Sequence, residues 1–435
     1  MFSEKNKNIY LLIFLAYWIL LWLSINTFPS KQGLFTISGS MFATTRLIMA
    51  LFSTLLMITF CFIYIIIKKK FKISRIYLIL ILIFISQIIG LYYNENKDFS
   101  LAHSFLPILA IGTIALFILC EQIDTKIITK YFFWILIFFL TIAFIINVYP
   151  KINDLKYFDF QSAFAGREAN IFGLTNPRVT GLSRSLSIIN LFLILLFFNS
   201  KKDYAKSFMF ILITAISVII IFCQSRGTLL CYFTSLTILI FFLQNPKNSF
   251  KLKKFLILAV LPLILYISIN TSINRNISSN KDIKINNRIL IKNTSGRIET
   301  WNYSLKNYNY KKIFGYGPQG DRFFLKDFKI ITKKKGYGDN SSNIFIYTLL
   351  SGGIISTLLL ILFFYEILKI FIKNKNLLFF NKNSMYLNFS TLCIVFFSIR
   401  SLFENSFGLF SIDFLIMCLS VFFINNYTKK ITTND

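Results

Sequence analysis

Acidic residues and histidine are scarce in this sequence. Its 435 residues include 18 Asp and Glu against 47 Lys and Arg, and a single histidine, His103. There is no HExxH motif, no DxD-like pair and no Cys/His cluster, so a metal-dependent mechanism has no evident ligands, and we expect no cofactor. The six cysteines lie in or beside apolar runs without CxxC spacing, which favours small buried residues over metal ligands or disulfides.

Long polar stretches are equally rare, which excludes a soluble globular protein. Hydrophobic residues make up 55% of the chain, and the mean hydropathy is +0.64. They fall in blocks of about twenty, the length of a helix that crosses a hydrocarbon layer of roughly 30 Å. The runs are continuous, whereas barrel strands would alternate, so we predict an all-α, polytopic membrane helix bundle. The predicted spans are 9–26, 43–67, 76–93, 101–120, 131–149, 183–199, 207–222, 227–243, 255–271, 343–371, 385–402 and 407–425.

The basic residues indicate how these twelve spans are oriented. Most Lys lie in short clusters between apolar blocks, as in KKKFKISR (68–75), and such loops are typical of the cytoplasmic side. The charge of +29 therefore needs no nucleic acid to explain it. We expect a multi-pass protein of the inner membrane with both termini in the cytoplasm. The other side carries two long connections, 150–182 and 272–342.

These connections divide the predicted chain into three parts. Residues 1–271 hold spans one to nine, 272–342 form a large extracytoplasmic loop domain, and 343–435 hold spans ten to twelve and a cytoplasmic tail. The loop carries fifteen Lys and Arg against five Asp and Glu, on the side where topology does not require positive charge. It is predicted to dock an anionic substrate or anionic headgroups; the alternative is a merely solvated domain.

The arginines are distributed differently from the lysines. Of eleven Arg, only Arg75 is predicted on the cytoplasmic face. Because the guanidinium group offers a planar fork of donors that matches phosphate oxygens, this bias suggests phosphate recognition at headgroup depth. Snorkelling of individual side chains to the interface is the alternative. The ten outer arginines are Arg46, Arg167, Arg178, Arg184, Arg226, Arg275, Arg288, Arg297, Arg322 and Arg400.

Two arginine motifs stand out. CQSRG (223–227) predicts a tight outer turn between two spans and contains Arg226. SGRIETW (295–301) opens a predicted amphipathic helix, in which an N-cap at Ser295 or Gly296 would direct N–H groups and Arg297 at an anion. We expect this helix on the outer surface with Trp301 at the membrane interface, or packed on the bundle.

The predicted outer face also contains a glycine-rich segment and a small number of carboxylates. The segment 315–320 fits GxGxxG, but no parallel βαβ unit surrounds it, so we interpret it as a glycine-rich turn. The outer face offers few carboxylates that could serve as a general base, and the sequence does not rank them. These are Glu168, Glu299, Asp321, Asp327, Asp339 and Glu404.

Taken in order, these segments resemble the superfamily of O-antigen ligases and O-antigen polymerases. The resemblance depends on the order and placement of short motifs, and on the single large outer loop before a span that contains Gly-Gly. The motifs are RVTGLSR (178–184), QSRG (224–227), SGRIETW (295–301), IFGYGPQG (313–320), SSNIFIYTLLSGGI (341–354) and IRSLFEN (399–405).

The resemblance implies transfer of a glycan from a polyprenyl diphosphate carrier to an acceptor, with inversion at the anomeric carbon and without metal or nucleotide. Arg226 and Arg297 match arginines that hold the diphosphate, and Arg178 and Arg400 lie in matching segments. Many relatives have His-Asn where this chain has Ser342-Asn343, so the base is open, with Asp339 or Glu404 as candidates. The predicted catalytic residues are Arg226, Arg297, Ser342, Asn343 and Glu404, and the predicted substrate-binding residues are Arg178, Arg184, Trp301, Arg322 and Arg400.

The resemblance also implies partners. The donor is a polyprenyl-diphosphate-linked glycan, and the acceptor is lipid A-core for a ligase or another carrier-linked glycan for a polymerase. Membrane lipids and a chain-length regulator are further expected partners, and nucleic acid is not one. The alternative function is a transporter of an anion or a lipid-linked sugar, although we find no internal repeat of the kind that transporters show.

Overall fold

All regular structure in the described part of the chain is helical, which confirms the predicted all-α class. The computed structural model describes residues 7–25, 41–67, 73–93, 104–121, 125–149, 160, 179–241, 256–278, 297–309, 313–322, 324–325, 328, 340–373 and 385–432.

Helices occur at all twelve predicted spans, and one more follows Arg297 as predicted. The first group comprises α1 (Lys7–Leu23), α2 (Met41–Ile67), α3 (Arg75–Gly90) with a 3-10 turn η2 (Leu91–Tyr93), α5 (Phe105–Cys120) and α6 (Thr125–Val148). The second comprises α8 (Val179–Asn199), α9 (Asp203–Phe222), α10 (Arg226–Phe241) and α12 (Leu261–Ser278), the last preceded by a π-helical turn η5 (Leu256–Val260). The third comprises α13 (Arg297–Asn307), α15 (Ile344–Lys373), α17 (Met385–Arg400) and α18 (Ile412–Thr432).

Five of these helices are long and apolar enough to cross a membrane, by length and composition. They lie within α2, α6, α8, α9 and α15, and the other seven predicted spans are shorter apolar helices. The protein is therefore a multi-pass membrane protein, and the count of twelve crossings stays a prediction. Large apolar side chains point outward, for example Phe62 on α2 (64% exposed) and Ile211 on α9 (65% exposed), as expected of a lipid-facing surface.

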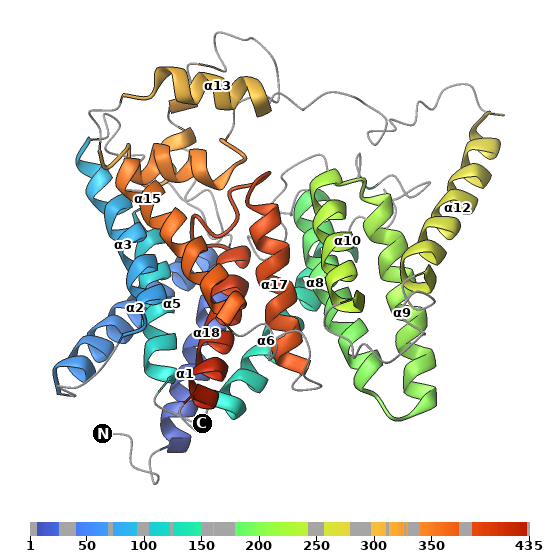
Figure 1. Cartoon of the computed structure of the whole chain (residues 1–435), viewed down its shortest axis with the longest axis horizontal. Helices are drawn as coiled ribbons and strands as arrows, with labels where there is room; N and C mark the ends of the chain where they lie inside the picture. Colours follow the sequence, from blue (N-terminus) through green and yellow to red (C-terminus); the bar gives the residue numbers. More distant parts are fainter. Residues whose placement is uncertain are drawn as a thin grey trace.

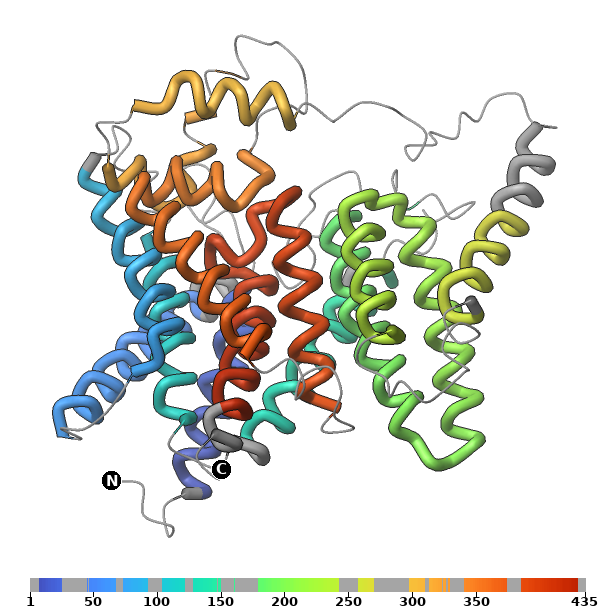
Figure 2. Tube along the Cα trace, in the orientation of Figure 1, coloured from blue at the N-terminus to red at the C-terminus, as the bar shows by residue number. Residues whose placement is uncertain are grey.

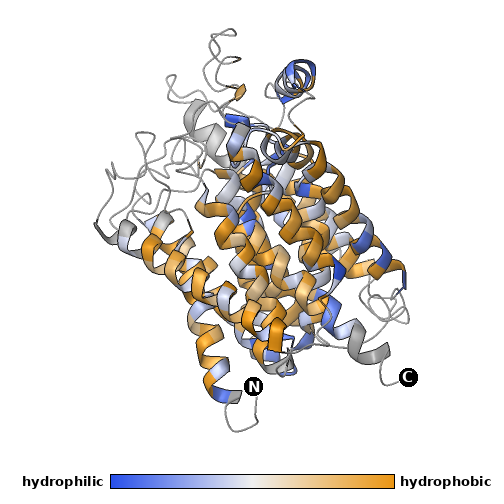
Figure 3. Cartoon of the chain, turned by 90° about the vertical axis from the view of Figure 1, so that its left-hand side faces the viewer, coloured by the Kyte–Doolittle hydropathy of each residue, from blue (hydrophilic) through white to orange (hydrophobic). Residues whose placement is uncertain are grey.

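The helices form a bundle with two distinct ends. In Figure 1 the chain begins and ends at the bottom, and α13 lies across the top. The tube in Figure 2 shows α8, α9, α10 and α12 (green to yellow) as a group beside the helices of the chain's beginning and end. Helix α17 joins the two groups, since it packs against both α10 and α18. Hydrophobic colours cover the middle of the helices in Figure 3, and hydrophilic colours gather toward the ends, including α13.

Aromatic side chains fill the core of the first group. The Trp18 ring is fully buried and lies 5.1 Å from the Phe132 ring and 5.6 Å from the Phe117 ring, centroid to centroid. Phe117 in turn stacks on Phe422 of α18 at 4.9 Å. Since lipid provides little hydrophobic drive for association, such close packing holds the first and last helices of the chain together.

The predicted glycine-rich turn, 315–320, lies within the segment 313–320, which docks on a kink in α15. At Gly353 (φ 73°, ψ −166°) the helix is interrupted. The carbonyls of Leu350 and Ser351 accept hydrogen bonds from the backbone N–H groups of Tyr316 (2.8 Å) and Gly317 (2.9 Å). The loop therefore supplies donors at the interruption, which satisfies backbone groups that would be costly to bury alone.

Glycine in α3 makes room for this junction. A Cβ at Gly90 would lie 2.8 Å from the Gly317 nitrogen and 2.9 Å from the Ser351 carbonyl oxygen, distances that real Cβ atoms do not show. Three segments far apart in sequence thus meet backbone to backbone: the end of α3, the turn 313–320 and the middle of α15.

The last predicted span was placed too early. Residues 401–411 form turns, and α18 begins at Ile412 rather than at 407. Phe407 has a φ of 46°, outside the helical range, and the Ser411 hydroxyl accepts a hydrogen bond from the Phe414 N–H (3.3 Å), as an N-cap does. The apolar residues of 407–411 are therefore part of a structured connection between α17 and α18.

We predict that Gly353→Ala destabilises the protein strongly. The φ of 73° costs a residue with a side chain roughly 1–2 kcal/mol, and the new Cβ would collide with the Ile313 carbonyl oxygen. Gly227→Ala is the matched control, because its Cβ would meet only Phe403, at 3.7 Å or more. Thermal unfolding in detergent should show a clearly lower midpoint for Gly353→Ala than for Gly227→Ala; equal midpoints would contradict the strained junction.

Candidate functional site

Charged side chains converge at the end of the bundle that carries α13. They come from the second turn of α8, from the first turns of α10, α13 and α18, from the last residue of α17 and from the connection 401–411. These elements span most of the second half of the chain, so the site exists only in the folded bundle.

The Asp413 carboxylate bridges two arginines. Its Oδ1 accepts from Arg184 Nη1 at 2.6 Å, and its Oδ2 accepts from Arg400 Nε at 3.3 Å. All three side chains are nearly buried, with exposed fractions of 14% for Arg184, 6% for Arg400 and 5% for Asp413. Two positive charges therefore share one negative charge in a low-dielectric setting, and the group retains one net positive charge.

The predicted QSRG turn is attached to this group through hydroxyls. Arg400 Nη1 donates to Thr228 Oγ1 (3.1 Å), which also accepts from Ser225 Oγ (2.9 Å). Gln224 adopts a φ of 49°, which makes the tight turn that the sequence predicted. Arg226 follows as the first residue of α10, and its side chain is exposed. The turn thus presents an exposed guanidinium group two residues before Thr228, which contacts Arg400.

A second ion pair lies nearer the surface. Arg297 Nη2, at the start of α13, donates to Glu404 Oε1 at 3.0 Å, and the two side chains are 30% and 24% exposed. Glu404 also interacts electrostatically with Arg184 and Arg400. Arg297 and Glu404 therefore belong to the same cluster as Asp413, and they form its accessible part.

Ser342 and Asn343 lie at the start of α15 beside this cluster. Ser342 has a φ of 46° and donates its hydroxyl to Asn340 Oδ1 at 2.6 Å. Asn343 Oδ1 accepts the N–H groups of Phe345 (2.8 Å) and Ile346 (3.2 Å), so Asn343 caps the helix. The observed contacts of Asn343 are structural, and catalytic roles for both residues stay predictions.

Asp321 joins three segments of the site. Its Oδ2 accepts from Ser341 N (2.9 Å), Ser341 Oγ (3.1 Å) and Asn405 Nδ2 (3.2 Å), and the residue is 1% exposed. Asn405 Oδ1 accepts from Asn343 N (3.0 Å) and Ser341 Oγ (3.0 Å). The turn 313–320, the start of α15 and the connection that carries Glu404 are thereby fixed to one another.

The structure also places the remaining predicted residues. The Trp301 indole donates to the Ser341 carbonyl oxygen (2.7 Å) and packs against a small core of Tyr308, Tyr316, Ile346 and Leu350. Helix α13 is therefore packed on the bundle, the alternative left open by the sequence. Arg322 is exposed, next to Asp321. Arg178, His103, Glu168, Asp327 and Asp339 lie outside the described residues, as do Ser295 and Gly296.

Asp413 and Asn405 were missed from the sequence. Asp413 is the only acidic residue of α18, an otherwise largely apolar helix, and a charge in such a setting is expected to have a partner. That signal could have found it. Asn405 had no comparable signal, because nothing in the sequence relates it to Asp321 or Asn343.

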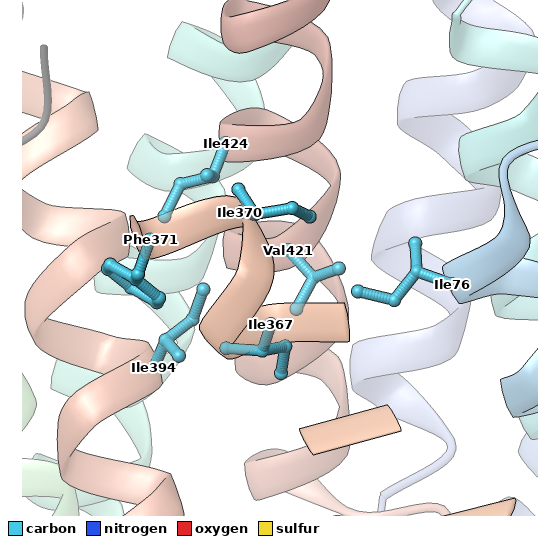
Figure 4. A pocket seen from close by; sticks show the side chains of 7 residues that line it. All are labelled: Ile76, Ile367, Ile370, Phe371, Ile394, Val421 and Ile424. Carbon is cyan, nitrogen blue, oxygen red and sulfur yellow. The ribbon is translucent and has the colours of Figure 1, made fainter. Parts of the chain in front are cut away.

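A small pocket elsewhere has a different character. It lies between α3, α15, α17 and α18 and is lined by apolar side chains such as Ile76, Ile394 and Val421 (Figure 4). Without polar groups it offers no chemistry. Within the described residues, no three His, Cys, Asp or Glu side chains are grouped to hold a metal ion.

We predict that Asp413→Asn destabilises the fold. Removing this carboxylate leaves Arg184 and Arg400 buried without a full counter-charge, which costs on the order of 3–5 kcal/mol. Asp203→Asn is the control, because that side chain is 97% exposed in its pair with Lys206. Thermal unfolding of the purified proteins checks this, and an unchanged midpoint for Asp413→Asn would contradict the role of the bridge.

Comparison with protein families bears on the same region. Residues 208–361 match the family model described as Wzy_C, O-Antigen ligase. The match runs from α9 into α15 and includes Arg226, Arg297 and Ser342, whereas Arg184, Arg400 and Asp413 lie outside it. None of the curated proteins matches the chain.

The match bears out the resemblance that the order of motifs had indicated, and it connects the protein with O-antigen ligation or polymerisation in a membrane. The segment 208–361, which contains Arg226 and Arg297, is thus similar to the O-antigen ligase family, and this similarity supports the superfamily of O-antigen ligases and polymerases.

Proposed function

We propose that the protein transfers a glycan from a polyprenyl diphosphate carrier to an acceptor hydroxyl during assembly of a cell-surface polysaccharide. The observation that carries the proposal is the cluster in which Arg184, Arg297 and Arg400 form ion pairs with two carboxylates, Asp413 and Glu404, at one end of a membrane bundle. The family match over 208–361 supports the same reaction class.

The electrostatics of the cluster suit a diphosphate leaving group. As the glycosidic bond breaks, negative charge develops on the diphosphate, and fixed guanidinium groups stabilise it without a metal ion. Arg226 and Arg297 are accessible and would contact the phosphates directly. Arg184 and Arg400 are held by Asp413 and would act through the field of the buried positive charge.

We place this chemistry on the extracytoplasmic face of the inner membrane. Helix α13, which begins with Arg297, lies at the end of the bundle opposite to the start of α1 and the end of α18 (Figure 1). The Lys-rich segment 200–206, at the end of α8 and the start of α9, lies at the other end and supports its assignment to the cytoplasm. The 272–342 domain, with spans one to nine before it and ten to twelve after it, would then face the donor and acceptor.

The acceptor decides between two activities. Transfer to a second carrier-linked glycan makes the protein a polymerase, and transfer to lipid A-core makes it a ligase. We predict that proteoliposomes with a carrier-linked oligosaccharide release free polyprenyl diphosphate. A ladder of longer products identifies a polymerase, and a single shift that requires lipid A-core identifies a ligase. No release from folded protein would contradict the proposal and favour transport.

The accessible arginines provide the mutational test. Arg226→Ala and Arg297→Ala should each lower glycan transfer by at least about 100-fold, because each removes a charge-assisted contact to the leaving group. Arg75→Ala is the control, since it removes an exposed charge at the start of α3, in the predicted cytoplasmic region. Normal product from both variants, at equal protein levels, would exclude the diphosphate-binding role.

The proposal also predicts how transfer responds to chelation. Turnover in EDTA should equal turnover without it, because the arginines provide the positive charge that a metal ion would otherwise supply. Measuring polyprenyl diphosphate release with EDTA and after addition of Mg²⁺ or Mn²⁺ tests this. Loss of activity in EDTA that either ion restores would overturn the metal-free mechanism.

A further inference from the structure

We propose that Glu404 is the base that takes the proton of the acceptor hydroxyl, and that its ion pair with Arg297 is released when the donor diphosphate engages Arg297. The inference rests on the proposed function and adds to it the missing base and an order of events, donor before acceptor activation.

Exposure distinguishes Glu404 from the other described carboxylates at this end of the bundle. Asp413 is 5% exposed, and each of its oxygens binds an arginine. Asp321 is 1% exposed, and its Oδ2 accepts three hydrogen bonds that hold the segments together. Glu404 is 24% exposed, and its Oε1 accepts a hydrogen bond from Arg297. Glu299 is exposed on α13, outside the observed cluster.

The backbone around Glu404 is held firmly although its side chain is accessible. Its N–H donates to the Arg400 carbonyl oxygen at 3.0 Å, which fixes it one turn beyond the buried arginine. Its neighbour Asn405 is hydrogen-bonded to Asp321, Ser341 and Asn343. A base must be positioned as well as accessible, and this arrangement provides both.

Ser342 is poorly suited to the same task. Its hydroxyl already donates to Asn340 Oδ1 at 2.6 Å, and a serine hydroxyl accepts a proton only with a partner base. No ion pair or hydrogen bond connects Ser342 with Glu404 in the described structure. The carboxylate is therefore the stronger base at this end of the bundle.

The ion pairs of the cluster differ in how easily they exchange partners. The Arg297–Glu404 pair is partly exposed, so solvent screens it more than the buried pairs, and a diphosphate with several negative charges competes for Arg297. The buried Asp413 cannot be replaced in this way without leaving charges unpaired. Donor binding thus moves Arg297 from Glu404 to the diphosphate and frees Glu404 Oε1 to take the acceptor proton, while Arg184 and Arg400 continue to interact electrostatically with Glu404.

The step balances as an inverting displacement. The acceptor oxygen forms a bond to the anomeric carbon from the face opposite to the diphosphate, while the bond from that carbon to the diphosphate oxygen breaks and its electron pair stays on the diphosphate. The acceptor proton passes to Glu404, which returns it to water after product release. One carboxylate suffices, since the leaving diphosphate needs no protonation when guanidinium groups bind it.

The test separates donor binding from turnover in the full-length protein. Farnesyl diphosphate serves as the binding probe by calorimetry in detergent, and membrane vesicles from a host that lacks this gene supply the carrier-linked glycan for turnover. Glu404→Gln should bind the probe as tightly as the wild type or up to about fivefold tighter, because Arg297 loses its competitor. Its turnover should fall by about 100-fold or more, and Glu404→Asp should recover part of that loss.

Azide provides a second readout that a structural defect would not give. This anion needs no deprotonation, so it should restore donor cleavage to a Glu404→Ala variant with a glycosyl azide as the product. It should give no such rescue to Arg297→Ala, which lacks a leaving-group contact rather than the base. Thermal unfolding of each variant shows whether it is folded.

The outcomes are distinct. If Glu404→Gln turns over within threefold of the wild type, or binds the probe more weakly than the wild type, the proposal is wrong. The same holds if azide fails to restore cleavage to folded Glu404→Ala. If the wild type itself releases no polyprenyl diphosphate, the proposed function fails, and that result is separate from any effect of Glu404.

Discussion

One buried carboxylate, Asp413, determines how the charged end of the bundle is built. It binds Arg184 of α8 and Arg400 of α17 from the first turn of α18, so three helices from both halves of the bundle are joined by ion pairs where little water reaches. The bridge carries a net positive charge, because two guanidinium groups pair with one carboxylate. That remaining positive charge, in a setting of low dielectric, makes the region attractive to a phosphate group even before any accessible side chain makes contact. The position of the QSRG turn follows from the same bridge, because Arg400 also holds Thr228.

Around Asp413, some residues are held by buried hydrogen bonds, and others have accessible side chains that can change their partners. Asp321, Ser341 and Asn405 form a buried hydrogen-bond network that sets the positions of the start of α15 and of the connection between α17 and α18. Arg226, Arg297 and Glu404 project from these fixed segments with accessible side chains. Such a division would suit the proposed glycan transfer, because the supporting backbone is organised beforehand and only side chains would need to move to bind a diphosphate.

The sequence predicted most of the helices, because apolar runs of this length are typical of membrane-spanning helices and because clusters of Lys and Arg mark the loops between them. It placed the start of α18 five residues early, since the apolar run that contains Phe407 and Phe410 does not reveal the positive φ of Phe407. It singled out Arg184, Arg226, Arg297, Arg400 and Glu404, which the structure brings to one end. What it could not predict were the pairings. Arg184 and Asp413 are 229 residues apart in the sequence, and neither segment contains a pattern that indicates an ion pair with the other.

The junction of Gly90, the turn 313–320 and Gly353 has a consequence for the order in which the protein assembles during synthesis. The end of α3, where Gly90 has no side chain, is synthesised early. The backbone groups that lie against Gly90 belong to a turn and a helix synthesised much later. Until α15 has been synthesised and inserted, the N–H groups of Tyr316 and Gly317 lack the carbonyl acceptors of Leu350 and Ser351, so the turn cannot take its final position. The connection that bears Glu404 is later still, and it depends on the same turn through Asp321. The charged cluster is therefore among the last parts of the molecule to form, so a partially inserted chain carries no assembled site.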